Sequence, residues 1–127
     1  MITVTQFLYE LMDGILKREQ DNENMIYLYY VNGTWSAIER SAYFLSQMVA
    51  CEVITLLAQD HKEAPEGQIV LASVSDTMLR TAVRSYSVVR HSLDHLILRP
   101  INIPTHYAEW HQDNLVQDLD DDDLEDA

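Results

Sequence analysis

The sequence predicts a single α+β domain in which helices pack on a small mixed sheet, in the order α-β-β-α-β-α-β. Three observations lead to this class. A helical apolar pattern opens the chain, a hairpin signal follows it, and later apolar segments alternate between helical spacing and β-branched runs. With 127 residues, 47% of them hydrophobic, and only three Gly and three Pro, the composition is that of one globular domain.

The first helix is expected from Val4 to about Lys17, because apolar residues recur there at the spacing of one helix face: Phe7, Leu8, Leu11, Ile15 and Leu16. The next run, MIYLYYV at 25–31, is rich in β-branched and aromatic residues and is expected to be a strand. Asn32-Gly33 is the strongest short signal for a hairpin, so a return strand is expected from Thr34 to Ile38.

One long helix is expected from about 40 to 59, because six apolar residues stay on one helical stripe: Ile38, Ala42, Leu45, Val49, Val53 and Leu56. The segment EVITLLA within it also has the composition of a strand, but the helical period continues through it. A strand at 68–74, a helix at about 76–95 and a strand at 96–103 follow. Two strands joined by a helix form a right-handed parallel βαβ unit, so these two strands are predicted to be parallel.

Charge is unevenly distributed along the chain. The formal net charge is −13, and residues 113–127 carry eight acids and no base. We therefore expect a globular domain over 1–112 and a disordered acidic tail over 113–127, because such a segment has little to bury and its charges repel one another. A polyanion also repels a phosphate backbone, which disfavours nucleic acid as a partner.

Several functional classes find no support in the motifs. Cys51 is the single cysteine and cannot form an intramolecular disulfide, and the start of the chain lacks the basic region of a signal peptide. No run of apolar residues is long enough to span a membrane, so a cytoplasmic protein without a membrane partner is expected. The three glycines are isolated, no Gly-x-Ser-x-Gly elbow occurs, and we expect no enzyme.

Two stretches of the sequence resemble a known family. TQFLYELMDGILKREQDNENMIYLYYVNGTWSAIERSAYFLSQM, and later QIVLASVSDTMLRTAV, are similar in element order to the N-terminal mismatch-recognition domain of MutS-type DNA mismatch-repair proteins. The resemblance covers about residues 5–103 and implies a similar fold. That family uses a Phe and a Glu two residues later; here Trp35 and Ala37 stand at those positions, or Thr34 and Ser36 in the adjacent register. The resemblance therefore implies no binding residue.

A basic stripe on the predicted helix 76–95 and the aromatic residues of the hairpin are the candidate binding residues. The stripe suits an anion or an acidic partner, and an uncovered aromatic strand face suits a protein. The candidates for this anion- or partner-binding site are Arg80, Arg84, Trp35, Tyr27 and Tyr30.

His91 and His95 are four residues apart, a spacing that on a helix lets two imidazoles reach one zinc ion. No thiolate pair accompanies them, and surface histidines explain the same pattern. No cofactor is expected, and zinc on His91 and His95 is the alternative.

Taken together, these features predict a non-enzymatic accessory or protein-interaction domain that binds a protein through a sheet face or edge. Two alternatives stay open. One is a nucleic-acid-associated module with a mismatch-recognition-like fold that binds through Arg80, Arg84 and Trp35; the other is a metal protein that binds through His91 and His95.

Overall fold

The computed structural model describes residues 2–58, 61–62, 64–83, 87–92, 94–99 and 106–116. Within them, six strands form one sheet in the order β3-β4-β2-β1-β6-β5. The strands are β1 (Ile26–Val31), β2 (Thr34–Ile38), β3 (Glu52–Leu57), β4 (Gln68–Val74), β5 (Ser87–His91) and β6 (His95–Arg99). All five strand pairs are antiparallel, and one isolated parallel bridge joins Ile2 to Val31.

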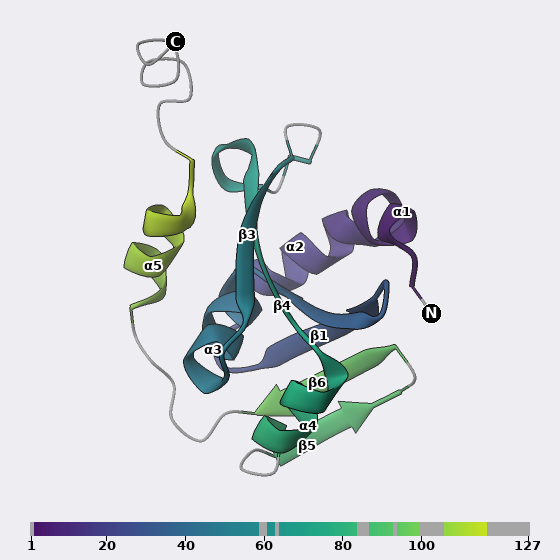
Figure 1. Ribbon diagram of the computed structural model, residues 1–127. Helices are drawn as coiled ribbons and strands as arrows, with labels where there is room; N and C mark the ends of the chain where they lie inside the picture. The colour runs from purple at the N-terminus through teal and green to yellow at the C-terminus, as the bar shows by residue number, and fades with distance from the viewer. Residues whose placement is uncertain are drawn as a thin grey trace, which may run out of the picture.

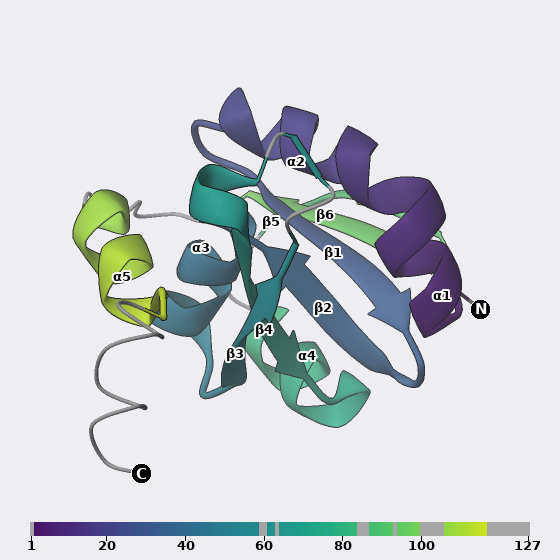
Figure 2. The same ribbon diagram turned by 90° about the horizontal axis from the view of Figure 1, so that it is seen from above.

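Helices cover both faces of the sheet (Figures 1 and 2). The helical segments are α1 (Val4–Gln6), η1 (Phe7–Leu11), α2 (Met12–Gln20), α3 (Arg40–Met48), η2 (Pro65–Gly67), α4 (Asp76–Val83) and α5 (Tyr107–Asn114). The first three run on as one N-terminal helix, whose start is fixed by a capping box between Thr3 and Gln6. This helix buries its apolar side against one sheet face, while α3, α4 and α5 lie on the other.

The core has two parts, one on each face of the sheet. On the N-terminal helix side, Phe7, Met12 and Leu16 pack with Tyr29 and Leu71. On the opposite side the larger cluster joins α3 and α4 to the strands, with these members: Leu28, Trp35, Phe44, Leu45, Ala72, Leu79 and Leu98. The alternation of side chains along β1 and β2 divides the hairpin between the two clusters.

The β1–β2 hairpin forms at Asn32-Gly33. Asn32 has φ 49° and Gly33 has φ 87°, and positive φ at both central residues defines a type I′ turn. Tyr30 then faces Trp35 across the pair.

The α+β class with helices packed on a small sheet is confirmed, but the predicted helix over 40–59 is wrong beyond Met48. Val49 is extended at φ −151°, ψ 149°, and Glu52–Leu57 forms β3. Three consecutive β-branched residues, Val53, Ile54 and Thr55, favour the strand. The helical spacing gave the wrong prediction because both faces of β3 are partly exposed, so its apolar residues do not alternate strictly.

The predicted helix over 76–95 is also wrong beyond Val83. Residues 87–91 and 95–99 are the strands of a second hairpin, closed by a hydrogen bond from Ser92 N to His95 O of 2.8 Å. Strands β2 and β1 separate β4 from β6, and three antiparallel pairings in succession leave β4 and β6 antiparallel. The predicted parallel βαβ unit is therefore absent from the described sheet, and the rest of the predicted strand 96–103, residues 100–103, lies outside the described residues.

The folded part of the chain extends past the expected boundary at residue 112. Helix α5 continues to Asn114, Leu115 is buried, and Val116 is hydrogen-bonded to Gln68. The rest of the predicted acidic tail, residues 117–127, lies outside the described residues. Among the described helices, none is both long and apolar enough to cross a bilayer.

Candidate functional site

The outer edge of β3 carries exposed apolar side chains. Strand β3 ends the strand order, and no described strand pairs with its outer side. Ile54 is 42% exposed and Leu57 is 64% exposed, whereas most apolar residues of the central strands are buried. On its inner side β3 pairs with β4 over six consecutive positions without a register shift, so the pairing is regular along the whole strand.

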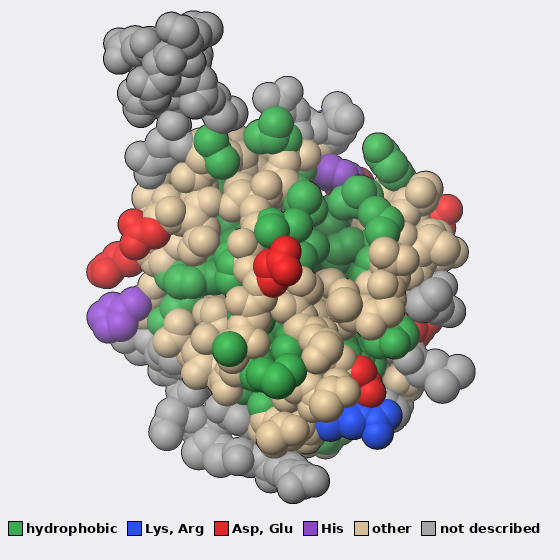
Figure 3. All heavy atoms as spheres, viewed as in Figure 1, with side chains coloured by type: hydrophobic (Ala, Val, Ile, Leu, Met, Phe, Trp, Pro, Cys, Tyr) green, Lys and Arg blue, Asp and Glu red, His purple; other side chains and the backbone are tan. Residues whose placement is uncertain are grey.

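Next to this edge lies a hollow of about 240 Å³ between β3 and the N-terminal helix, which we call the β3 groove. Figure 3 shows apolar side chains gathered in this hollow, between the position of β3 and β4 and that of the N-terminal helix in Figure 1. Its walls are formed by these residues: Val4, Phe7, Leu8, Val31, Asn32, Thr34, Ser36, Ile54, Leu56, Leu71 and Ser73. The β3 groove is therefore mainly apolar, with a polar end at the β1–β2 turn.

The N-terminal helix carries a π-helical turn over Phe7–Leu11, which supplies Phe7 and Leu8 to the β3 groove. A π-turn inside an α-helix costs hydrogen-bond geometry and is frequent at functional sites. The ring of His61, in the segment that follows β3, lies 2.7 Å from a carboxylate oxygen of Asp13 on α2 and ties that segment to the helix. The two walls of the groove are thus connected by a polar contact.

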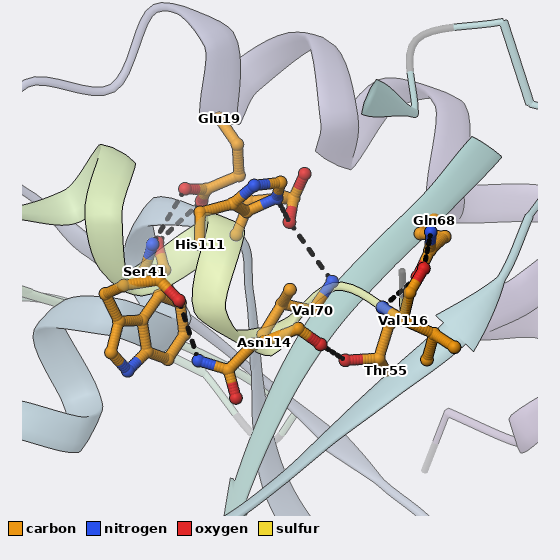
Figure 4. A network of polar contacts seen from close by, with 10 residues as sticks. Glu19, Ser41, Thr55, Gln68, Val70, His111, Asn114 and Val116 are labelled. Carbon is orange, nitrogen blue, oxygen red and sulfur yellow. Dashed lines mark hydrogen bonds and ion pairs between the residues drawn. The ribbon is translucent and has the colours of Figure 1, made fainter. Parts of the chain in front are cut away.

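The C-terminal end of α5 bonds to the face of β3 opposite the groove and covers part of it. The hydroxyl of Thr55 donates to the carbonyl of Asn114 (2.5 Å), and the side chain of Gln68 bonds both the N–H (2.8 Å) and the C=O (3.0 Å) of Val116. Figure 4 shows these contacts side by side. Because α5 occupies part of this face, a ligand of β3 has access to the strand edge and to the groove.

Helix α5 is anchored by a buried polar contact between His111 and Glu39, with Nε2 and Oε2 2.8 Å apart. Glu39 joins β2 to α3 and has φ 53°, ψ −116°, a strained conformation for a residue other than glycine. Its backbone N–H donates to the carbonyl of Val70, and its carboxylate accepts the N–H of Val70 (3.1 Å). These bonds hold the strained residue in place and direct its carboxylate towards α5.

A second buried carboxylate, Glu19, connects α2 to the start of α3. It accepts hydrogen bonds from the N–H (2.9 Å) and the hydroxyl (2.5 Å) of Ser41 and from the amide of Asn22 (3.1 Å). Burial raises the pKa of Glu19 to about 7, the bonds from Ser41 and Asn22 oppose this rise, and the nearby carboxylate of Glu39 adds to it. Glu19 and Ser41 are 2% or less exposed, so these side chains stabilise the fold and are not accessible to a substrate.

The predicted anion site is only partly assembled. Trp35 and Arg80 both line a hollow of about 320 Å³ with Asp76, Leu79, Val83, Val88 and Leu96. Trp35 is 5% exposed and its indole N–H donates to Asp76 (3.0 Å), while the guanidinium of Arg80 lies 2.7 Å from the same carboxylate. The Trp35 ring is therefore enclosed and Arg80 is partly neutralised; Arg84 lies outside the described residues.

The two candidate tyrosines contribute to packing. Tyr30 lies against Trp35 with ring centroids 5.1 Å apart, and Tyr27 lies under the guanidinium of Arg18 at 4.9 Å. Both are half-buried, on opposite faces of the sheet. Neither forms the open aromatic surface that the sequence allowed.

The premise of a zinc site on one helix face is wrong, because His91 and His95 lie on the neighbouring strands β5 and β6. His95 is half-buried and stacks on Tyr29 with centroids 4.9 Å apart. No group of three or more His, Cys, Asp or Glu residues that could hold a metal ion occurs among the described residues. Cys51 precedes β3 instead of lying in a helix, and burial raises the pKa of its thiol.

The residues of the β3 edge and of the α5 anchor were not among the predicted site residues. A signal for the edge was present, since EVIT combines β-branched residues with a single terminal charge. The partnership of Glu39 with His111 joins positions 72 residues apart in the chain, and no local pattern indicates such a pair.

Comparison with known proteins gives no relative: no protein-family model, no curated protein and no solved structure matches this chain. The resemblance to the mismatch-recognition domain therefore stays a prediction, and function has to be argued from the site.

Proposed function

We propose that this chain is a non-enzymatic protein-interaction domain that binds its partner at the β3 edge and the adjoining β3 groove. The observation that supports this most directly is a regularly paired edge strand, with no described strand on its outer side, whose exposed Ile54 lines an apolar hollow. Exposed apolar surface of this kind next to backbone groups that lack a strand partner is typical of protein-binding sites.

The polar network under α5 supports the same proposal. It holds α5 and α3 against the sheet with buried hydrogen bonds, which keeps β3 in place when its outer side is unoccupied. A preformed site loses less conformational entropy on binding than a flexible one. The carboxylates of this network are buried and bonded within the protein, so they act as supports in this proposal and not as catalytic groups.

The test uses a photo-reactive amino acid placed at Ile54, which lines the β3 groove, in one sample and at Met78 in another. Met78 is a suitable control because it is 47% exposed and apolar but lies on α4, away from the groove. Proteins that crosslink from position 54 and not from position 78 are then purified and their affinity for the chain is measured.

The decisive measurement is the affinity of that purified partner for two matched variants. Ile54→Glu is expected to weaken binding at least about tenfold, because it places a charge in an apolar contact, and Met78→Glu is expected to leave it unchanged. Equal loss in both variants, or a partner that binds Ile54→Glu as well as the unchanged chain, would remove the β3 edge as the binding site.

A further inference from the structure

We infer that the partner of the β3 edge is an extended segment of another protein that adds to the sheet as a further strand, with alternating apolar residues flanked by Lys or Arg. This inference rests on the proposed function and specifies the occupant of the same site. It follows from the backbone of the edge, the shape of the groove and the distribution of charge.

The backbone of β3 is suited to strand addition. Its six residues carry one charged side chain, Glu52, at the very start, and no Pro or Gly interrupts them. The pairing with β4 is continuous from Glu52 opposite Ser73 to Leu57 opposite Gln68. An edge with these properties presents a regular row of N–H and C=O groups, and an extended segment can pair with such a row.

The surroundings of β3 distinguish the two faces of an added strand. Successive side chains of a strand point to opposite faces, so every second residue of the added segment would lie on the side of the β3 groove, near Ile54 and Leu56. On the other side the chain end of α5, held by Thr55 and Gln68, limits the space. Alternation of apolar residues with small polar ones fits this arrangement.

Charge selects a basic partner over a second copy of the chain. Exposed acids lie at both ends of β3. Glu52 begins the strand. Glu66 lies near its other end, because the carbonyl of the next residue, Gly67, accepts a hydrogen bond from the N–H of Ala58, which follows the strand. Lys62, in the connection between β3 and β4, offsets part of this charge.

The acidic end of the chain adds to this field. Val116 is bonded to Gln68, whose strand partner is Leu57, and the sequence after Val116 holds seven Asp or Glu residues and no Lys or Arg. In the sequence these acids follow directly on Val116, which is held against Gln68 of β4. A second copy has the same net charge of −13, whereas a segment with Lys or Arg at its ends is attracted.

The experiment uses a fluorescent synthetic peptide, Lys-Lys-Val-Thr-Ile-Thr-Val-Lys-Lys, and two versions that carry one backbone N-methyl group. One methyl group is on the central Ile and the other on the Thr that follows. Because successive N–H groups of a strand point in opposite directions, only one of these two lies between the peptide and β3. We expect one methylated peptide to bind about as well as the parent and the other at least about tenfold more weakly.

Three comparisons complete the test. A peptide with Glu in place of each Lys is expected not to bind. The full-length chain with its seven acids after Val116 changed to Asn or Gln is expected to bind the parent peptide more weakly at low salt, with the difference lost at 1 M salt, where the Debye length is about 3 Å. Ile54→Glu is expected to weaken binding, and Met78→Glu is not.

Equal binding of both methylated peptides, or no binding of the parent peptide at all, would overturn strand addition. If the crosslinked partner described above still depends on Ile54 in that case, the proposed function stands and only the mode of binding is refuted. A chain that sediments as a dimer and becomes monomeric on Ile54→Glu would replace the basic segment with a second copy.

Discussion

Strands β3 and β5 both end the sheet, but they differ in the features that control pairing with another chain. Strand β3 pairs with β4 without interruption and has the sequence EVITLL. Strand β5 pairs with β6 through a register shift between Val88 and Arg90 and has the sequence SVVRH. Irregular pairing and basic residues are two of the devices by which proteins prevent edge association, and β3 has neither.

The difference indicates that one edge is protected and the other is left open. The strand order does not explain this difference, because each edge strand has one antiparallel neighbour at an end of the same sheet. What sets β3 apart is its support: α5 covers part of one of its faces and the N-terminal helix lines a groove on the other. A supported, regularly paired and apolar edge has the properties of a binding site, and three changes in the chain test this comparison.

The largest effect is expected from His111→Ala, which removes the anchor of α5. It leaves the side chain of Glu39 buried without the hydrogen-bonding partner that α5 supplies, and leaving a buried polar group of this kind unsatisfied costs on the order of 3 kcal/mol or more. The loss should be concentrated at β3, because α5 contacts Thr55 and covers that end of the sheet.

Urea unfolding measures the cost of His111→Ala, and hydrogen exchange locates it. Amides of β3 should exchange faster relative to those of β1, and the same comparison should show little change in β6. Glu109→Ala, an exposed position on the same helix, is the control and should change stability by less than about 0.5 kcal/mol. Uniform acceleration across all strands would show that α5 does not support β3 in particular.

The second effect concerns Glu19, which connects α2 to Ser41 at the start of α3. Its pKa is raised from 4.5 to about 7, so between these values the folded state holds a proton that the unfolded state has lost. Stability from this group is therefore complete below about pH 4.5 and is lost as the pH rises through 7. The shift corresponds to a difference on the order of 3 kcal/mol between acidic and alkaline conditions.

Glu19→Gln keeps the shape and removes the titration. The difference in unfolding free energy between this variant and the unchanged chain should grow in favour of the variant from pH 4.5 to pH 8. Taking the difference cancels the other carboxylates, among them Asp76, whose pKa is lowered by the bond from Trp35 and by Arg80. A difference that is flat over this range would mean that Glu19 is ionised in the folded protein near its ordinary pKa.

The sequence predicts those features of the fold that depend on neighbouring residues, and it does not predict those that depend on contacts between residues far apart in the chain. The first helix and the Asn32-Gly33 hairpin follow from local patterns, and the structure confirms both. At 52–57 and 87–91 local patterns favoured helix, because a half-covered edge strand has no strict alternation. In these two segments tertiary contacts favour strand over helix: the six residue pairs between β3 and β4, and the hairpin of β5 with β6.

The candidate site shows the same limit. Trp35, Tyr27 and Tyr30 were identified by residue type, but cross-strand and helix contacts bury them at least in part. Ile54 and Leu57 lie in a segment that looked like part of a buried helix, and only their position at the sheet edge exposes them. Exposure depends on strand order, and strand order depends on pairings between residues far apart in the chain.

The smallest effect on stability, and the most direct contrast of the two edges, is expected from a lysine placed on each of them. Ile54 is 42% exposed and Val88 is 49% exposed, so Ile54→Lys and Val88→Lys should each change the unfolding free energy by no more than about 0.5 kcal/mol. Their effects on self-association should differ. A lysine at the centre of β3 introduces the charge that this edge lacks, whereas β5 already has its register shift and its own Arg90 and His91.

Light scattering during slow concentration at low salt measures this contrast. We expect Ile54→Lys to raise the concentration at which the chain aggregates and Val88→Lys to leave it unchanged, since an open apolar edge is where chains pair non-specifically. If both lysines act equally, net charge alone controls association, and the two edges are equivalent in spite of their different pairing. If only Ile54→Lys raises the aggregation concentration, the edge of β3 is the surface through which copies of this chain associate, and a specific partner would have to cover that surface.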